Sequence, residues 1–142
     1  FDIVQSNEKF VVIDDYAHHP TEIEATMKSV ELYDNLTNFN NRIVLWQPHK
    51  YSRTSDNLEG FKKCFRRCDE LIILPLWTVA GEKKIDIDFE KEFASYNPIF
   101  ADRVVSYKGK IELIKDDKII KTYDEGIFLG VGAGDITYQL RY

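Results

Sequence analysis

Residues 10–33 read FVVIDDYAHHPTEIEATMKSVELY, and this stretch decides the fold. It opens with an uninterrupted apolar run at 10–13, which is typical of a buried strand. Further along, Ile23, Met27 and Val30 recur at helical spacing on one face. A turn of two aspartates, a tyrosine and two histidines separates the two patterns. The stretch therefore predicts a strand, a polar turn and a helix.

The same strand-then-helix pattern recurs along the chain. An apolar run at 43–46 precedes a helical pattern at 58–65, and a third run at 71–74 precedes a looser helical pattern around 89–93. Alternation of this kind favours a mainly parallel sheet with helices packed against it. We therefore expect a Rossmann-like α/β fold of three layers, with helices on both faces of the sheet.

The last third of the chain departs from this rhythm. Apolar segments at 111–114 and 119–120 flank a polar turn at 116–117, which predicts a β-hairpin. A final apolar run at 127–131 leads into the glycine-containing segment 132–136. We expect a buried strand there, followed by a tight turn and a short terminal helix.

Length and composition are those of one compact domain. The 142 residues, 44% of them hydrophobic, suffice for one core, so we expect a single domain over 1–142. The 24 acidic and 19 basic residues are spread along the chain, which disfavours nucleic-acid binding. We find no membrane-spanning apolar stretch and no secretory leader, so we expect a cytoplasmic protein without membrane contact. Cys64 and Cys68, with no further ligands nearby, are expected to be reduced thiols.

Polar side chains gather where the expected strands end. In a parallel sheet, ligands bind beyond the carboxyl ends of the strands, where neighbouring turns meet. All three histidines, His18, His19 and His49, fall in the turns after the first two strands. Lys50 and Arg53 follow in the second turn, and their cationic groups suit a carboxylate or phosphate. The sequence predicts half of an anion-binding site at this edge of the sheet.

The same turns carry signals for helix starts. Thr21 and Glu24 have capping-box spacing, which predicts that the first helix begins just after the histidines. Ser55 is placed to cap the next helix. The glycine run at 130–134 lacks dinucleotide-binding spacing, so we interpret it as a tight turn capped by Asp135 rather than a phosphate cradle.

Four segments resemble signatures of the Mur ligase family, in the C-terminal domain of its UDP-N-acetylmuramate:L-alanine ligases. They are DDYAHHPTE at 14–22, QPHKYSRT at 47–54, AGE at 80–82 and GAGDI at 132–136. Together they cover nearly the whole chain, in family order and spacing. The second segment indicates L-alanine, because related ligases differ there.

The resemblance implies an ATP-dependent ligation in peptidoglycan biosynthesis. In this family ATP phosphorylates the lactyl carboxylate of UDP-N-acetylmuramate, and the amine of L-alanine attacks the acyl phosphate. No G-x-x-x-x-G-K-[ST] loop occurs in the chain. The family carries that loop, the Mg²⁺ ligands and the uridine site in two preceding domains. We therefore expect this domain to be inactive alone, without a catalytic residue, metal ligand or bound cofactor of its own.

The resemblance also implies roles for individual residues around the ligands. Asp15, with Asp14 as the alternative, is implied to bind the ribose hydroxyls of ATP. Tyr16, His18 and His49 are implied to line the L-alanine pocket.

The cationic pair Lys50 and Arg53 is implied to hold the carboxylate of the amino acid or the acyl phosphate, and the assignment of each stays open. Position 50 is commonly arginine in the family, so a two-pronged grip there is in question. The remaining implied site residues support the surrounding loops, and they are His19, Gly81, Glu82, Gly134 and Asp135.

Two other functions remain open from the sequence. Asp14, Asp15, His18, His19 and His49 could instead form the metal site of an Asp-His-His phosphoesterase. The chain could also be a Rossmann-like binding module without catalytic chemistry. Metal binding with unaided phosphoester hydrolysis distinguishes the first alternative, and absence of ligase activity in the intact protein distinguishes the second.

Overall fold

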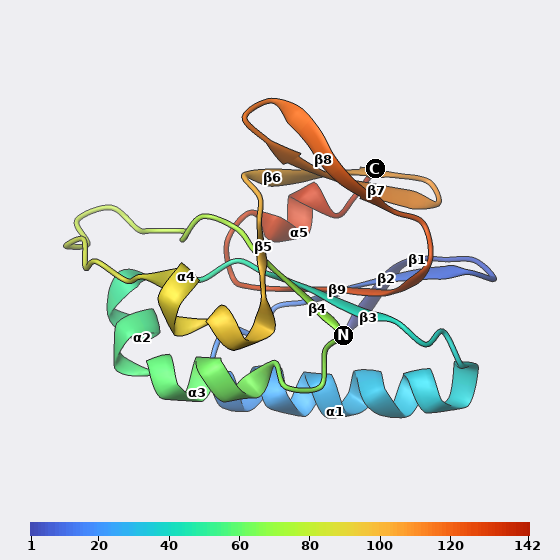
Figure 1. Cartoon of the computed structure of the whole chain (residues 1–142), viewed down its shortest axis with the longest axis horizontal. Coiled ribbons are helices and arrows are strands. Elements are labelled where there is room, and N and C mark those ends of the chain that lie inside the picture. The colour runs from blue at the N-terminus through green and yellow to red at the C-terminus, as the bar shows by residue number, and fades with distance from the viewer.

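The computed structural model describes residues 1–142 as two sheets with helices packed on them (Figure 1). None of the helices is both long and apolar enough to cross a membrane. The elements, in chain order, are β1 Asp2–Ser6, β2 Phe10–Asp15, α1 Pro20–Thr37, β3 Arg42–Trp46, α2 Tyr51–Asp56, α3 Leu58–Cys64, β4 Glu70–Ile73, α4 Phe89–Glu92, the 3₁₀ helix η1 Ala94–Tyr96, β5 Ile99–Phe100, β6 Arg103–Tyr107, β7 Lys110–Lys115, β8 Lys118–Tyr123, β9 Gly126–Val131 and α5 Ile136–Gln139.

The larger sheet has six strands in the order β1-β2-β9-β3-β4-β5. All neighbouring pairs are parallel except β1 and β2, which are antiparallel. The predicted α/β fold with a mostly parallel sheet is therefore confirmed, as are the strands expected at 10–13, 43–46, 71–74 and 127–131. The edge strands β1 and β5 were not expected, because neither carries a long apolar run.

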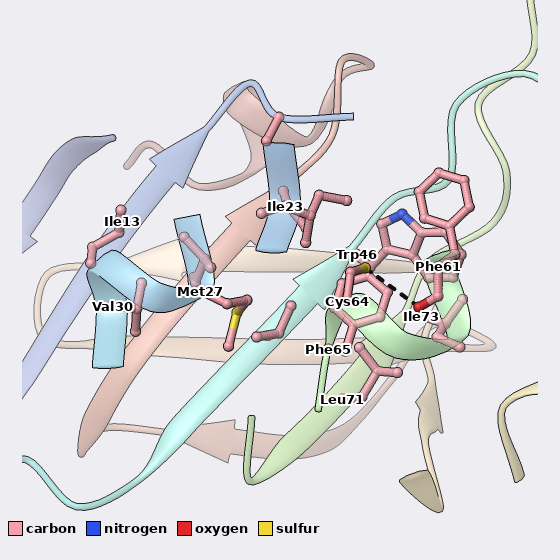
Figure 2. Close-up of a cluster of buried hydrophobic side chains, with 14 of the residues drawn as sticks. Ile13, Ile23, Met27, Val30, Trp46, Phe61, Cys64, Phe65, Leu71 and Ile73 are labelled. Carbon is pink, nitrogen blue, oxygen red and sulfur yellow. Dashed lines mark hydrogen bonds between the residues drawn. The ribbon is translucent and has the colours of Figure 1, made fainter. Parts of the chain in front are cut away.

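Helices α1 and α3 cover one face of this sheet (Figure 1). The apolar side chains at helical spacing, among them Ile23, Met27 and Phe61, are fully buried against the strands. Figure 2 shows Trp46 of β3 beside Phe61 and Phe65, whose ring centroids each lie 5.0 Å from that of Trp46. Burial of each such ring stabilises the fold by about 1.5–3 kcal/mol, which fixes α3 behind the end of β3.

The opposite face is covered mainly by the antiparallel sheet β6-β7-β8, with α5 beside it (Figure 1). Ile111 and Leu113 of β7 and Leu140 after α5 are buried against the large sheet. The predicted hairpin is present, and Asp116 and Asp117 have φ of 51° and 61°, as a tight two-residue turn requires. A helical layer was expected on this face, but α5 is the only helix there and a third strand joins the hairpin.

The caps predicted for the first two helices were wrong. His19, not Thr21, caps α1: the Thr21 N–H donates to His19 Nδ1 at 3.3 Å, and the His19 N–H donates to Glu22 Oε1 at 3.2 Å. Pro20 occupies the first helical position, where its missing N–H costs nothing. Ser55 lies inside α2, which begins earlier than expected, so part of the segment interpreted as a loop is helical.

Candidate functional site

The strands β2, β9 and β3 end in register at one edge of the large sheet. Asp15 is paired with Val131, and Val131 is paired in turn with Trp46. The ladder continues one step beyond the strands, since the Gln47 N–H donates to the Val131 carbonyl at 3.1 Å. The turns after these three strands therefore lie next to one another, although β9 separates β2 from β3.

Two histidines from different turns meet at this edge. The ring centroids of His18 and His49 are 6.2 Å apart in an edge-to-face arrangement. Tyr16 lies on the other side of His18, at 5.6 Å between centroids, and is 68% exposed. Arg53, one turn into α2, approaches His49 Nδ1 to 3.3 Å with a guanidinium nitrogen. We refer to Tyr16, His18, His49 and Arg53 as the imidazole cluster.

The third histidine has a different position. His19 uses its ring to cap α1, so it supports the turn and does not join the imidazole cluster. His18 Nδ1 instead lies 3.1 Å from the backbone carbonyl oxygen of Tyr16 and 3.9 Å from Glu22 Oε1. Adjacent histidines thus have separate tasks, which their identical residue type concealed in the sequence.

Asp14 and Asp15 face opposite sides of the sheet, as consecutive strand residues do. Asp14 is buried on the α5 side, where one carboxylate oxygen accepts hydrogen bonds from Thr137 and from Arg141 at 2.8 Å. Asp15 faces α1, and its two oxygens accept from the Ala17 N–H at 2.8 Å and the Thr26 hydroxyl at 3.1 Å. Asp14 is therefore occupied with holding the C-terminal segment.

Glu82 holds the start of α2 from the turn after β4. Its carboxylate accepts from the Tyr51 N–H at 2.9 Å, the Ser52 N–H at 3.3 Å and the Thr78 hydroxyl at 3.2 Å. Partial desolvation opposes its ionisation, but these donors outweigh that effect and lower its pKa. Gly81, at φ 83°, allows the turn that brings Glu82 there.

Gln47 joins the turn after β3 to the start of α5. Its amide nitrogen donates to Asp135 Oδ1 at 2.6 Å, and its amide oxygen accepts from the Ile136 N–H at 3.1 Å. Asp135 was expected to cap α5, yet its side chain makes no cap hydrogen bond, and Gln47 supplies the capping oxygen instead. Gly134 leaves room for this contact, since an added Cβ would lie 2.5 Å from Gln47 Oε1.

Burial and nearby positive charge both disfavour protonation of His49. Burial lowers the pKa of His49, and the nearby cations Arg53 and Lys50 lower it further. Lys50 itself has a φ of 67°, an uncommon backbone angle for a residue with a side chain, just before α2. The edge therefore presents two cations beside an imidazole whose pKa is lowered, an arrangement that suits an anionic ligand.

The side chains suggested as metal ligands are not arranged around a common point. The structure contains no group of three or more His, Cys, Asp or Glu side chains able to hold a metal ion. His19 caps α1, and Asp14 is held by Arg141. Cys64 and Cys68 are free thiols, as expected.

Comparison with known proteins gives consistent matches. Residues 1–122 match the model of the family "Mur ligase, glutamate ligase domain". A UDP-N-acetylmuramate--L-alanine ligase from Helicobacter pylori is 55% identical over 99% of this chain, which covers 31% of that protein. A ligase of the same name from Campylobacter curvus is 48% identical over 99% of the chain and is covered to 32%.

The chain thus spans about a third of the length of these curated relatives. Among solved structures, a domain from Haemophilus ducreyi, described as a UDP-N-acetylmuramate:L-alanyl-gamma-D-glutamyl-medo-diaminopimelate ligase, aligns with 96% of this chain and 90% of its own. Its sequence identity is 13% and the TM-score is 0.46.

Proposed function

The chain belongs to the Mur ligase family, and on this premise we propose that it is the C-terminal domain of an ATP-dependent ligase that joins L-alanine to UDP-N-acetylmuramate. The observation that carries the proposal is the 55% identity, over 99% of the chain, to a relative named for that reaction. The imidazole cluster and Lys50 supply a cationic edge suited to its anionic reactants. The chain corresponds to 31% of that relative, so we assign the reaction to the complete protein.

For the nucleotide we assign the ribose contact to Asp15 rather than Asp14. Oδ1 of Asp15 accepts one hydrogen bond, from the Ala17 N–H, and can accept a second from a ribose hydroxyl, while Oδ2 accepts from Thr26 and lies 3.2 Å from the N-terminal ammonium of Phe1. Asp14 is buried on the opposite face of the sheet, where it forms an ion pair with Arg141 and accepts a hydrogen bond from Thr137. ATP, when bound, supplies the phosphoryl group that turns the unreactive lactyl carboxylate into an electrophile.

For the amino acid we assign the carboxylate contact to Arg53, with Lys50 as a second cation. A guanidinium binds a carboxylate through two parallel hydrogen bonds, whereas an ammonium acts as a point charge. Glu82 supports both residues indirectly, because it fixes the first turn of the helix from which Arg53 projects. Tyr16, exposed above His18, is assigned to the wall of the same pocket.

We assign the phosphate-binding loop, the Mg²⁺ ligands and the uridine site to parts of the complete protein outside this chain. No phosphate-loop sequence occurs in the 142 residues, and none of their acidic groups forms a metal site. We place the complete protein in the cytoplasm, where ATP and nucleotide-linked precursors of peptidoglycan are available.

An assay of the complete protein tests this function. We expect phosphate release from ATP only when UDP-N-acetylmuramate and L-alanine are both present, with UDP-N-acetylmuramoyl-L-alanine as product by mass spectrometry. L-Glutamate in place of L-alanine is the matched control and should give little release. Preference for L-glutamate, or no coupled release with either amino acid, would refute the proposal. Unaided hydrolysis of a phosphoester with manganese would support the phosphoesterase alternative.

A further inference from the structure

In their neutral forms, the two histidines of the imidazole cluster have opposite tautomers. His18 Nδ1 lies 3.1 Å from the Tyr16 carbonyl oxygen, which can only accept, so Nδ1 carries the hydrogen. In the neutral ring, Nε2 is then the basic nitrogen without a hydrogen. His49 Nδ1 lies 3.3 Å from the Arg53 guanidinium, which can only donate, so Nδ1 accepts and Nε2 carries the hydrogen. One ring presents a base and its neighbour presents a donor.

The charged groups beside the two histidine rings have opposite signs. The groups facing His18 are Tyr16, Glu22 and His49, and the Glu22 carboxylate lies 3.9 Å from its Nδ1. His49 lies instead beside the cation Arg53, which opposes a second proton on its ring. A carboxylate thus lies beside His18, and a guanidinium lies beside His49.

Resting on the proposed function, we propose that His18 is the base that deprotonates the incoming amino acid, and that His49 remains a neutral hydrogen-bond donor. The amino acid arrives as an ammonium ion, which cannot attack a carbonyl carbon. One ammonium proton passes to His18 Nε2, and the freed amine forms the C–N bond to the acyl carbon. The bond from that carbon to the phosphate oxygen breaks, and the second amine proton leaves with the phosphate.

His49 serves the same step through its Nε2–H. That group donates to a carboxylate oxygen of the amino acid or to the oxygen that gains charge at the acyl carbon. Neutral imidazole donates without first losing a proton, and a preorganised donor stabilises developing negative charge. The Arg53 contact is what keeps His49 in this tautomer.

Substitution of His18 by asparagine distinguishes the roles of the two ring nitrogens. In H18N, the side-chain amide nitrogen takes the place of Nδ1 and can still donate to the Tyr16 carbonyl, but no basic nitrogen remains. At position 49 the matched change is H49Q, because the glutamine amide places an N–H near the position of Nε2. H49N, which loses that donor, is its control.

The experiment compares two nucleophiles in the complete protein supplied with ATP and UDP-N-acetylmuramate. L-Alanine needs a base at neutral pH, whereas hydroxylamine is mostly unprotonated there and traps an acyl phosphate as the hydroxamate. We expect H18N to lower kcat/KM for L-alanine by about 10²-fold, the usual contribution of a positioned base. The hydroxylamine reaction should bypass this defect, and a rise in pH should restore part of the L-alanine rate. H49Q should retain more L-alanine activity than H49N.

Each outcome bears on the proposal. If H18N ligates L-alanine as fast as the wild type, His18 is not the base. If H18N loses the L-alanine and hydroxylamine reactions equally, His18 acts in acyl-phosphate formation and the base assignment is also wrong. In both cases the ligase function stands. If the wild type forms neither product, the proposed function itself fails.

Discussion

At the scale of single residues, the hydrogen-bond partner of each polar side chain determines the role of that side chain. His18, His19 and His49 lie within 31 positions of one another in sequence and share one side-chain chemistry, yet one caps a helix and two form the imidazole cluster. Parallel topology was enough to predict that their turns would meet. The ring nitrogen that each hydrogen bond engages could not be predicted, because Arg53 and the Tyr16 carbonyl are brought to the rings only by folding.

The lowered pKa of His49 predicts a pH-dependent contribution to stability. In the unfolded chain this imidazole has its ordinary pKa of 6.5, while burial, Arg53 and Lys50 lower it in the folded chain. As the pH falls through about 6.5, the unfolded state binds more protons, so the free energy of unfolding decreases. We expect the wild-type Tm to fall more steeply between about pH 7 and pH 5 than that of His49→Gln. Equal slopes in thermal unfolding would contradict this expectation.

Among the helices and strands, the main discrepancy from sequence-based expectation is the source of the helix caps. Glu82 caps α2 from 31 residues away, and Gln47 caps α5 from 89 residues away. Capping rules compare residues three or four positions apart, so they cannot find partners that a different strand supplies. Helices of four to six residues are stable here because neighbouring turns satisfy their free N–H groups.

Substitution of Gly134 tests the close packing between the turn after β3 and the turn that leads into α5. Its φ lies outside the left-handed region, so alanine would ordinarily stabilise the chain by about 0.4–1 kcal/mol. Here the added Cβ would lie 2.5 Å from Gln47 Oε1 and 2.6 Å from Trp77 Cγ. We therefore expect Gly134→Ala to lower the free energy of unfolding in urea by about 1–3 kcal/mol. An increase would show that Gln47 does not occupy this space.

For the molecule as a whole, the sequence predicted a parallel sheet but not everything that covers it. Continuous apolar runs identify β2, β3, β4 and β9 without knowledge of their neighbours. Strand order is set by long-range pairing, so nothing local indicated that β9 would lie between β2 and β3. That insertion brings the start of α5 into contact with Gln47, so the turns after β2, β3 and β9 lie at one edge of the sheet.

The central claim is that this edge binds the amino acid in the complete protein, and Arg53→Ala tests it most directly. We expect kcat/KM for L-alanine to fall by about 10²-fold or more, because a charged contact of about 3 kcal/mol is lost. Arg66→Ala is the matched control, since it removes the same charge at an exposed site paired with Glu24, away from the edge. A loss confined to Arg53→Ala supports the claim. Activity of Arg53→Ala equal to that of the wild type and of Arg66→Ala would contradict it.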